Sequence, residues 1–227
     1  MPPMGWCVSN HIAEGLIMPR QNRVTPLGDI ISTAARGNFM GNRGCLHDND
    51  QNIRRLYQSR RWIICQLNFK GRRQPIMAPR HYTQLFFLDE ATALAAGHRP
   101  CAECMRSRFN AFCSLWAQAH PGLAGGLKPS VDVIDTILHQ ERITATKQKV
   151  TYPEQIDHLP DGSFITLEQG GQPYLVLEDT LFSWSPEGYH QRITRPTDQI
   201  VQVLTPRSVV NTLVHGYKTI IHPSAFV

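Results

Sequence analysis

The spacing of apolar residues predicts strands and helices that follow one another through the middle of the chain. An apolar run over 82–88 predicts a strand, and the Ala-rich stretch after it predicts a short helix that Asp89 can cap through its carboxylate. Gly97 occupies the position where a left-handed residue would end that helix. Apolar side chains recur at helical spacing over 105–119 and 131–147, so we predict two longer helices there.

Alternating polar and apolar residues over 62–69 predict a second strand, which ends in a Lys-Gly turn. Cys65 lies on the apolar face of this strand. It is either a small buried hydrophobic residue or a ligand that completes a metal site across a hairpin. Trp62, at the start of the strand, is interpreted as a core residue, with stacking on a nucleic-acid base as the alternative.

From residue 152 onward the pattern changes to short apolar runs separated by turn residues such as Asp-Gly, Gly-Gly and Pro-Glu-Gly. The predicted strands span 163–167, 174–178, 189–193 and 200–204. Their spacing is typical of a small antiparallel sheet or barrel. Thr205 is a candidate cap for a following short helix, with Pro206 at its first position.

The composition favours a protein of a reducing compartment. The chain has 227 residues, 41% of them hydrophobic, which suffices for one large domain or two small ones. No apolar run approaches the roughly 20 residues that span a bilayer, and the N-terminus lacks the charged start and apolar stretch of a secretory signal. Six cysteines, two of them in one Cys-x-x-Cys turn, do not fit a disulfide scaffold. We therefore expect a cytoplasmic protein without a membrane partner.

The positive charge is concentrated in one region. The net charge is +5, but between Arg36 and Arg108 there are 13 Lys or Arg and 5 Asp or Glu, a balance of +8 that leaves −3 for the rest. Such a region predicts a polyanionic partner, here nucleic acid and DNA before RNA, with a solubilising surface as the alternative. The side chains expected to contact phosphates are Arg60, Arg61, Lys70, Arg72 and Arg73.

Two loops contain residues suited to metal or phosphate chemistry. The Gly- and Asn-rich loop 37–50 tolerates left-handed backbone and can bring backbone amides close to a phosphate. It also contains Cys45, His47 and Asp48. Further along, Pro100 precedes Cys101 and Cys104, and two thiolates from one tight turn suit the tetrahedral shell of zinc.

Residues 85–104, LFFLDEATALAAGHRPCAEC, resemble the second half of the zinc domain at the N-terminus of the Ada DNA-repair protein. They are also similar to related metal-binding modules attached to some bacterial nucleases. The shared features are an aromatic strand, an acidic Ala-rich helix and an R-P-C-x-x-C turn, with His98 where the family has Tyr or Phe. The rest of the chain is similar to a bacterial family that has G-N-R-G-x-L-H-D and G-H-R-P-C-A-E-C signatures.

The resemblance implies that Cys101 and Cys104 are zinc ligands. It does not supply the first cysteine pair of the family, because no Cys-x-x-x-Cys element precedes the matching strand. A zinc site with two protein ligands would be unstable, so we expect two more from upstream. The predicted pair is Cys65 and His81, and the alternatives are Cys45 and His47.

Together these observations predict an α+β fold in four segments. The segments are an N-terminal arm (1–31), a basic Ada-like zinc-knuckle domain (32–120), a linker and helix (121–150) and a small antiparallel β-rich C-terminal domain (151–227). The arm is expected to attach loosely and to contribute at most one strand.

Three functions are compatible with these residues. In the first, a structural zinc ion supports a domain that binds nucleic acid, DNA in particular, through its basic surface. In the second, His47 and Asp48 are catalytic residues of a metal-dependent nuclease. In the third, a zinc-activated thiolate accepts a methyl group, as the Ada resemblance implies, with Cys45 as the candidate.

Overall fold

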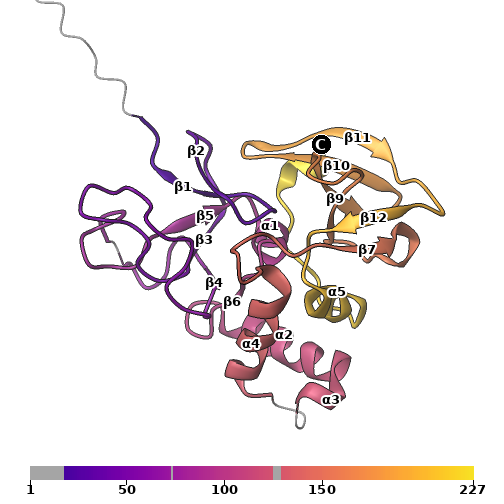
Figure 1. Cartoon of the computed structure of the whole chain (residues 1–227), viewed down its shortest axis with the longest axis horizontal. Helices are drawn as coiled ribbons and strands as arrows, with labels where there is room; N and C mark the ends of the chain where they lie inside the picture. The colour runs from indigo at the N-terminus through magenta and orange to yellow at the C-terminus, as the bar shows by residue number, and fades with distance from the viewer. Residues whose placement is uncertain (1–17, 73, 125–128) are drawn as a thin grey trace, which may run out of the picture.

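The computed structural model describes residues 18–72, 74–124 and 129–227. Within these ranges two six-stranded sheets lie on either side of the short helix α1 (Glu90–Ala95), and most of the other helices gather below them (Figure 1). This mixture of helices and sheets agrees with the predicted α+β class.

The first sheet has the strand order β2-β1-β5-β3-β4-β6. β1 runs parallel to β5 and β4 runs parallel to β6, whereas the other neighbours are antiparallel. The strands are β1 (Gln21–Val24), β2 (Ile30–Ser32), β3 (Phe39–Asn42), β4 (Ile63–Cys65), β5 (Leu85–Phe87) and β6 (Arg99–Pro100). The segment 1–31 is therefore not a loosely attached arm where it is described, because it adds two strands to this sheet; residues 1–17 lie outside the described ranges.

The second sheet is antiparallel throughout, in the order β11-β10-β9-β8-β12-β7. The four strands predicted in this part of the chain correspond to β8, β9, β11 and β12, whereas β7 and β10 were not predicted. The strands are β7 (Tyr152–Gln155), β8 (Phe164–Thr166), β9 (Pro173–Leu177), β10 (Thr180–Ser185), β11 (Gly188–Thr194) and β12 (Ile200–Val203).

Helix α1 begins and ends as the sequence predicts. The Asp89 carboxylate accepts a hydrogen bond from the backbone N–H of Thr92 at 2.8 Å, which satisfies a free amide of the first turn. Gly97 follows the helix with φ +86°, a left-handed conformation that glycine adopts without strain. All six residues of α1 are buried, so no face of the helix meets solvent.

The remaining helices pack around this centre. They are α2 (Arg106–Ala119), α3 (Pro121–Ala124), α4 (Val131–Arg142) and α5 (Arg207–Val214), with short 3-10 turns at Ile156–His158 and Pro223–Ala225. The predicted core stripe of α2 is confirmed, because Phe109, Phe112 and Trp116 are buried. Thr205 does not cap α5; its hydroxyl accepts from the backbone N–H of Phe164 at 2.8 Å, and Pro206 precedes the helix.

The packing crosses the predicted segment boundaries. The core beneath the first sheet contains Ile134 and Leu138 from α4 and Val209 and Leu213 from α5. The core of the second sheet contains residues of α1 and the residue before its cap, Leu88. Segments 32–120, 121–150 and 151–227 therefore share their cores, since α1 contributes side chains to both.

Candidate metal centre

The pairing of two short strands brings distant cysteines together. In the parallel pair of β4 and β6, Ile64 lies opposite Pro100, so the next residues along both strands, Cys65 and Cys101, lie side by side. The backbone N–H of Cys101 donates to the Ile64 carbonyl at 2.8 Å, which continues the ladder up to the cysteines. The turn after β6 then folds back and adds Cys104.

Cys65, Cys101 and Cys104 form a cluster of three thiols. Their sulfur atoms all lie within 4.8 Å of one another. A tetrahedral zinc site, with zinc–sulfur bonds of about 2.3 Å, places its sulfurs roughly 3.8 Å apart. Cys65 is buried and the other two are partly exposed, so the cluster has a protein side and a solvent side. These three residues could hold a metal ion after small side-chain rotations.

Hydrogen bonds within the turn favour negative charge on one sulfur. The thiol of Cys65 donates to Cys101, and backbone N–H groups of residues 103 and 104 also point at that sulfur, with a distance of 3.4 Å from Glu103. These contacts lower the pKa of Cys101 to about 5. The same hydrogen bond raises the pKa of Cys65, and burial raises that of Cys104. A metal ion would therefore meet one thiolate and displace protons from two thiols.

The loop that follows β4 attaches basic side chains to this cluster. Arg72 forms an ion pair with Glu103, inside the Cys-x-x-Cys turn, at 2.7 Å. Lys70 lies over the Phe69 ring, 5.2 Å from its centroid, and Arg72 approaches the same ring at 5.3 Å. Lys70 and Arg72 are both exposed, so a metal bound to the three thiols would fix a loop that presents positive charge to solvent.

The other predicted metal ligands lie outside the cluster. Among the residues that the structure describes, no fourth His, Cys, Asp or Glu joins it. His47 is buried, and its ring nitrogens contact the Thr83 hydroxyl at 2.6 Å and the Ala78 carbonyl at 3.2 Å. Cys45 donates its thiol to the His47 carbonyl at 3.7 Å, and the exposed His81 has its Nδ1 3.0 Å from the Pro79 carbonyl.

The catalytic candidates His47 and Asp48 form part of a stable turn. The Asp48 carboxylate accepts from the backbone N–H groups of Asp50 and Asn52 at 2.9 and 3.0 Å and from Arg54 at 2.6 Å. These bonds, the one from Asn52 first, lower its pKa. Since the His47 ring also has partners at both nitrogens, neither side chain is directed at a shared site for water or metal.

The predicted phosphate contacts separate into two groups. Arg60 and Arg61 precede β4, whereas Lys70 and Arg72 follow it on the side of the cysteines, and all four are exposed. Arg61 approaches Asp132 of α4 at 3.4 Å. The fifth candidate, Arg73, lies outside the described residues. Trp62, between the two groups, is buried, as the core interpretation predicts.

Sequence reasoning missed a set of buried cations. Arg43, of the G-N-R-G signature, and Arg142, the last residue of α4, are almost fully buried, and both lie against Trp62. Arg43 in the Gly-rich loop 37–50 could have indicated these cations, since a basic side chain in such a loop can reach the same ligand as the backbone amides.

Comparison with known proteins does not identify the chain: no family model, curated protein or solved structure matches it. The resemblance to the Ada zinc domain therefore stays a prediction. In the described part of the chain, no helix combines the length and the apolar character needed to cross a membrane.

Proposed function

We propose that this protein binds zinc through Cys65, Cys101 and Cys104, that the metal is structural, and that the basic loop beside it binds the phosphate backbone of DNA. The observation that carries the proposal is the cluster of three sulfurs next to an exposed basic loop. Thiolate ligands favour zinc over magnesium or calcium, which take oxygen ligands.

The position of the cluster, and not the number of its ligands, supports a structural role for the metal, since the three described cysteines leave one coordination position open. It ties the end of β4 to the turn between β6 and α2, two segments that are more than thirty residues apart in the chain. A metal at this point would hold the loop containing Lys70 and Arg72 against the sheet. Binding to phosphates through such side chains is largely independent of sequence and falls with salt.

The two alternative functions have less support from the geometry. A nuclease that uses His47 and Asp48 would need both side chains free, and both are held in local hydrogen bonds. A methyl acceptor that uses Cys45 would need that thiol among the metal ligands, and it lies outside the cluster.

The metal part of the proposal is tested by elemental analysis of the purified protein. We expect one zinc per chain, and loss of zinc in Cys65→Ser and in Cys101→Ser. Cys45→Ser is the matched control, since this partly buried cysteine lies outside the cluster, and it should retain the metal. Zinc that persists in both cluster variants would show that the three thiols are not the site.

The nucleic-acid part is tested by fluorescence anisotropy with labelled DNA over a range of salt concentrations. Replacing Lys70 and Arg72 by Gln should weaken binding and reduce the salt slope by about 1 for each lost phosphate contact. The charge-matched control replaces the exposed Arg192 and Lys218 by Gln, far along the chain in its C-terminal part. Equal slopes for the two double variants would contradict the proposed surface.

A further inference from the structure

The Gly-rich loop after β3 and the turn after α1 meet in the interior through a pair of basic side chains. Arg43 Nε lies 3.2 Å from Nε2 of His98, and both residues are buried. Since a guanidinium can only donate, His98 accepts at Nε2, and its Nδ1–H is left to donate to the Ala93 carbonyl at 3.3 Å. His98 is therefore a neutral imidazole that positions Arg43.

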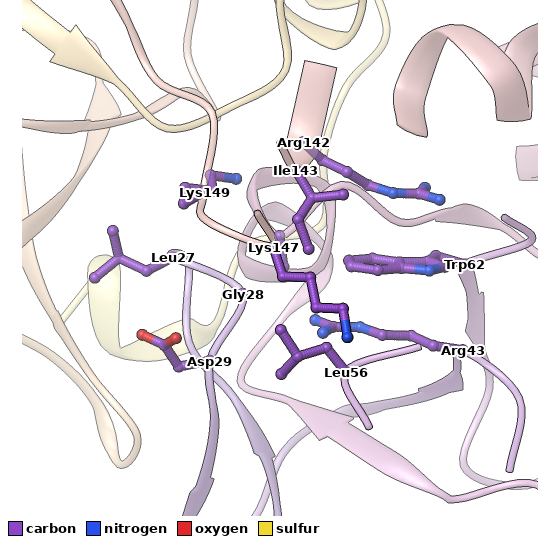
Figure 2. Close-up of a pocket in the computed structure, with 11 residues that line it drawn as sticks. Leu27, Gly28, Asp29, Arg43, Leu56, Trp62, Arg142, Ile143, Lys147 and Lys149 are labelled. Carbon is purple, nitrogen blue, oxygen red and sulfur yellow. The ribbon is translucent and has the colours of Figure 1, made fainter. Parts of the chain in front are cut away.

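Arg43 also belongs to a stack of three side chains. The indole of Trp62 lies between two guanidinium groups, with Arg43 Cζ 3.8 Å and Arg142 Cζ 4.0 Å from the ring centroid (Figure 2). Arg142 is tied down, because it donates to the carbonyls of Gly97 at 2.8 Å and Arg60 at 2.7 Å. Two buried nitrogens of the stack, Nη2 of Arg43 and Nε of Arg142, have no hydrogen-bond partner among the described residues.

The stack forms one wall of a cavity of about 40 Å³. Among its lining residues Arg43, Trp62, Ala96 and Arg142 are buried, whereas Asp29 and Lys147 are exposed. Lys149 also lines it and donates its amine to the Ala95 carbonyl.

The charges around this cavity do not balance. Among the described residues four cationic side chains line it, Arg43, Arg142, Lys147 and Lys149, and Asp29 supplies the single carboxylate. Burial, and then the neighbouring guanidinium groups, lower the pKa of Lys149 to about 7, and burial with Arg142 lowers that of Arg43 to about 9. Buried charges are costly unless they are paired and hydrogen-bonded, so an anion in the cavity would relieve both the repulsion and the unpartnered Nη2.

We propose that this cavity is a binding site for a phosphate group, either inorganic phosphate or the terminal phosphate of a larger molecule. A dianion matches the excess of positive charge better than a carboxylate does, and guanidinium groups suit phosphate oxygens. A water molecule needs roughly 10–15 Å³ of such space, so the cavity takes about three oxygen-sized groups and no base or sugar. A phosphodiester within a nucleic-acid chain is attached to a sugar on both sides and does not fit, whereas a terminal phosphate does.

The test is isothermal titration calorimetry of the full chain with inorganic phosphate at neutral pH and constant ionic strength. We expect one saturable site per chain. Lys149→Met should weaken it about tenfold or more, since a charge-assisted hydrogen bond is lost. Arg43→Met should do the same, and the exposed Lys218→Met should bind like the wild type. Because Arg43 is part of the core, each variant is first compared with the wild type in thermal unfolding; if Arg43→Met is unfolded, Lys149→Met alone decides.

Two oligonucleotides that differ only in a terminal phosphate distinguish the sources of the group. Preferential binding of the phosphorylated one, lost in Lys149→Met, would identify a nucleic-acid end; binding of inorganic phosphate alone, also lost in Lys149→Met, would identify a small phosphate. Both results support the site. It is overturned if the wild type binds no phosphate, or if the folded variants bind as tightly as the wild type. The double replacement of Lys70 and Arg72 leaves this site intact, so its outcome is separate from that of the proposed function.

Discussion

Glu90 is a fully buried carboxylate that accepts four hydrogen bonds from two distant parts of the chain. Its oxygens accept from Arg108 at 2.8 Å and again from the second nitrogen of that guanidinium, from the Tyr217 hydroxyl at 2.7 Å and from the Ile220 backbone N–H at 2.9 Å. We expect Glu90→Gln to lower the free energy of unfolding by about 2–3 kcal/mol. The NH₂ group of the Gln amide would face N–H or O–H groups that now donate to the carboxylate, and Arg108 would lose its counter-charge.

Urea unfolding followed by circular dichroism measures this loss. Asp132→Asn is the control, since Asp132 and its partner Arg61 are both largely exposed and such a pair contributes little. Similar stabilities for the two variants would show that the Glu90 network does not contribute as argued.

Lys149 gives the protein a pH-dependent stability of predictable sign. In the folded chain its pKa is about 7, against an ordinary value of 10.5, because of burial and of Arg43 and Arg142, which Asp29 only partly offsets. Between about pH 7 and pH 9 the unfolded amine keeps a proton that the folded one loses, so the unfolded state binds more protons and stability rises with pH. Arg43 and Arg142 stay largely protonated below their pKa values of about 9.

Lys149→Met should therefore flatten the rise in unfolding free energy over this range, measured in phosphate-free buffer. Lys218→Met, which removes an exposed amine, should keep the slope of the wild type. The interpretation fails if the unfolding free energy of Lys149→Met rises with pH as steeply as that of Lys218→Met and of the wild type.

At the scale of elements, local patterns predicted the helices better than the strands. α2 and α4 begin within one residue of the predicted starts, because amphipathic spacing is a local signal, although neither helix has a side-chain cap and α4 ends at Arg142 instead of near 147. β10 was missed because four of its six residues are buried, so no alternation marks it. β7 was missed because it is an edge strand that contains Pro153 and few apolar residues. The strand predicted over 62–69 ends at Cys65, where its pairing with β3 and β6 stops.

Gly97, which ends α1, is required by both backbone and packing. Its φ is +86°, and a Cβ at this position would lie 2.5 Å from Cδ of Arg142. Gly97→Ala should destabilise the protein by about 2 kcal/mol or more, from left-handed strain and from displacement of Arg142 off the Trp62 ring.

Thermal unfolding of matched alanine variants checks this. Gly122→Ala is the control, because Gly122 lies in α3 and a Cβ added there would have nothing within 4 Å, so this variant should lose no stability. A melting temperature for Gly97→Ala equal to that of the control would contradict the role assigned to this glycine.

At the scale of the molecule, the candidate site could be predicted only in part. The Cys-x-x-Cys turn is a local motif, but the approach of Cys65 depends on a parallel pairing between strands that are far apart in sequence. The phosphate cavity is less visible still, since Arg43, Trp62 and Arg142 meet only after α4 packs on the first sheet. Long-range contacts of this kind leave no periodic pattern in the chain.

The same long-range packing joins the two sheets into one structure. Two side chains of the second sheet complete the cap of α1: Trp184 donates to the Thr92 hydroxyl at 3.1 Å, and Tyr189 donates to the Asp89 carboxylate at 2.7 Å. The core of the second sheet also includes Ala91 and Ala95 of α1. We therefore expect the full chain to unfold in one transition, with coincident midpoints by circular dichroism and by tryptophan fluorescence.

For the same reason a fragment of residues 151–227 should not unfold cooperatively on its own. Without α1 and the two residues before it, its core loses Leu88, Ala91 and Ala95, and buried polar atoms of Trp184 and Tyr189 lose their partners. Trp184→Phe in the full chain removes one of these bonds and should cost only about 1 kcal/mol while unfolding stays cooperative. A fragment with a sharp transition and stability near that of the full chain would instead establish 151–227 as an independent domain. In that case α1 would merely dock against the second sheet.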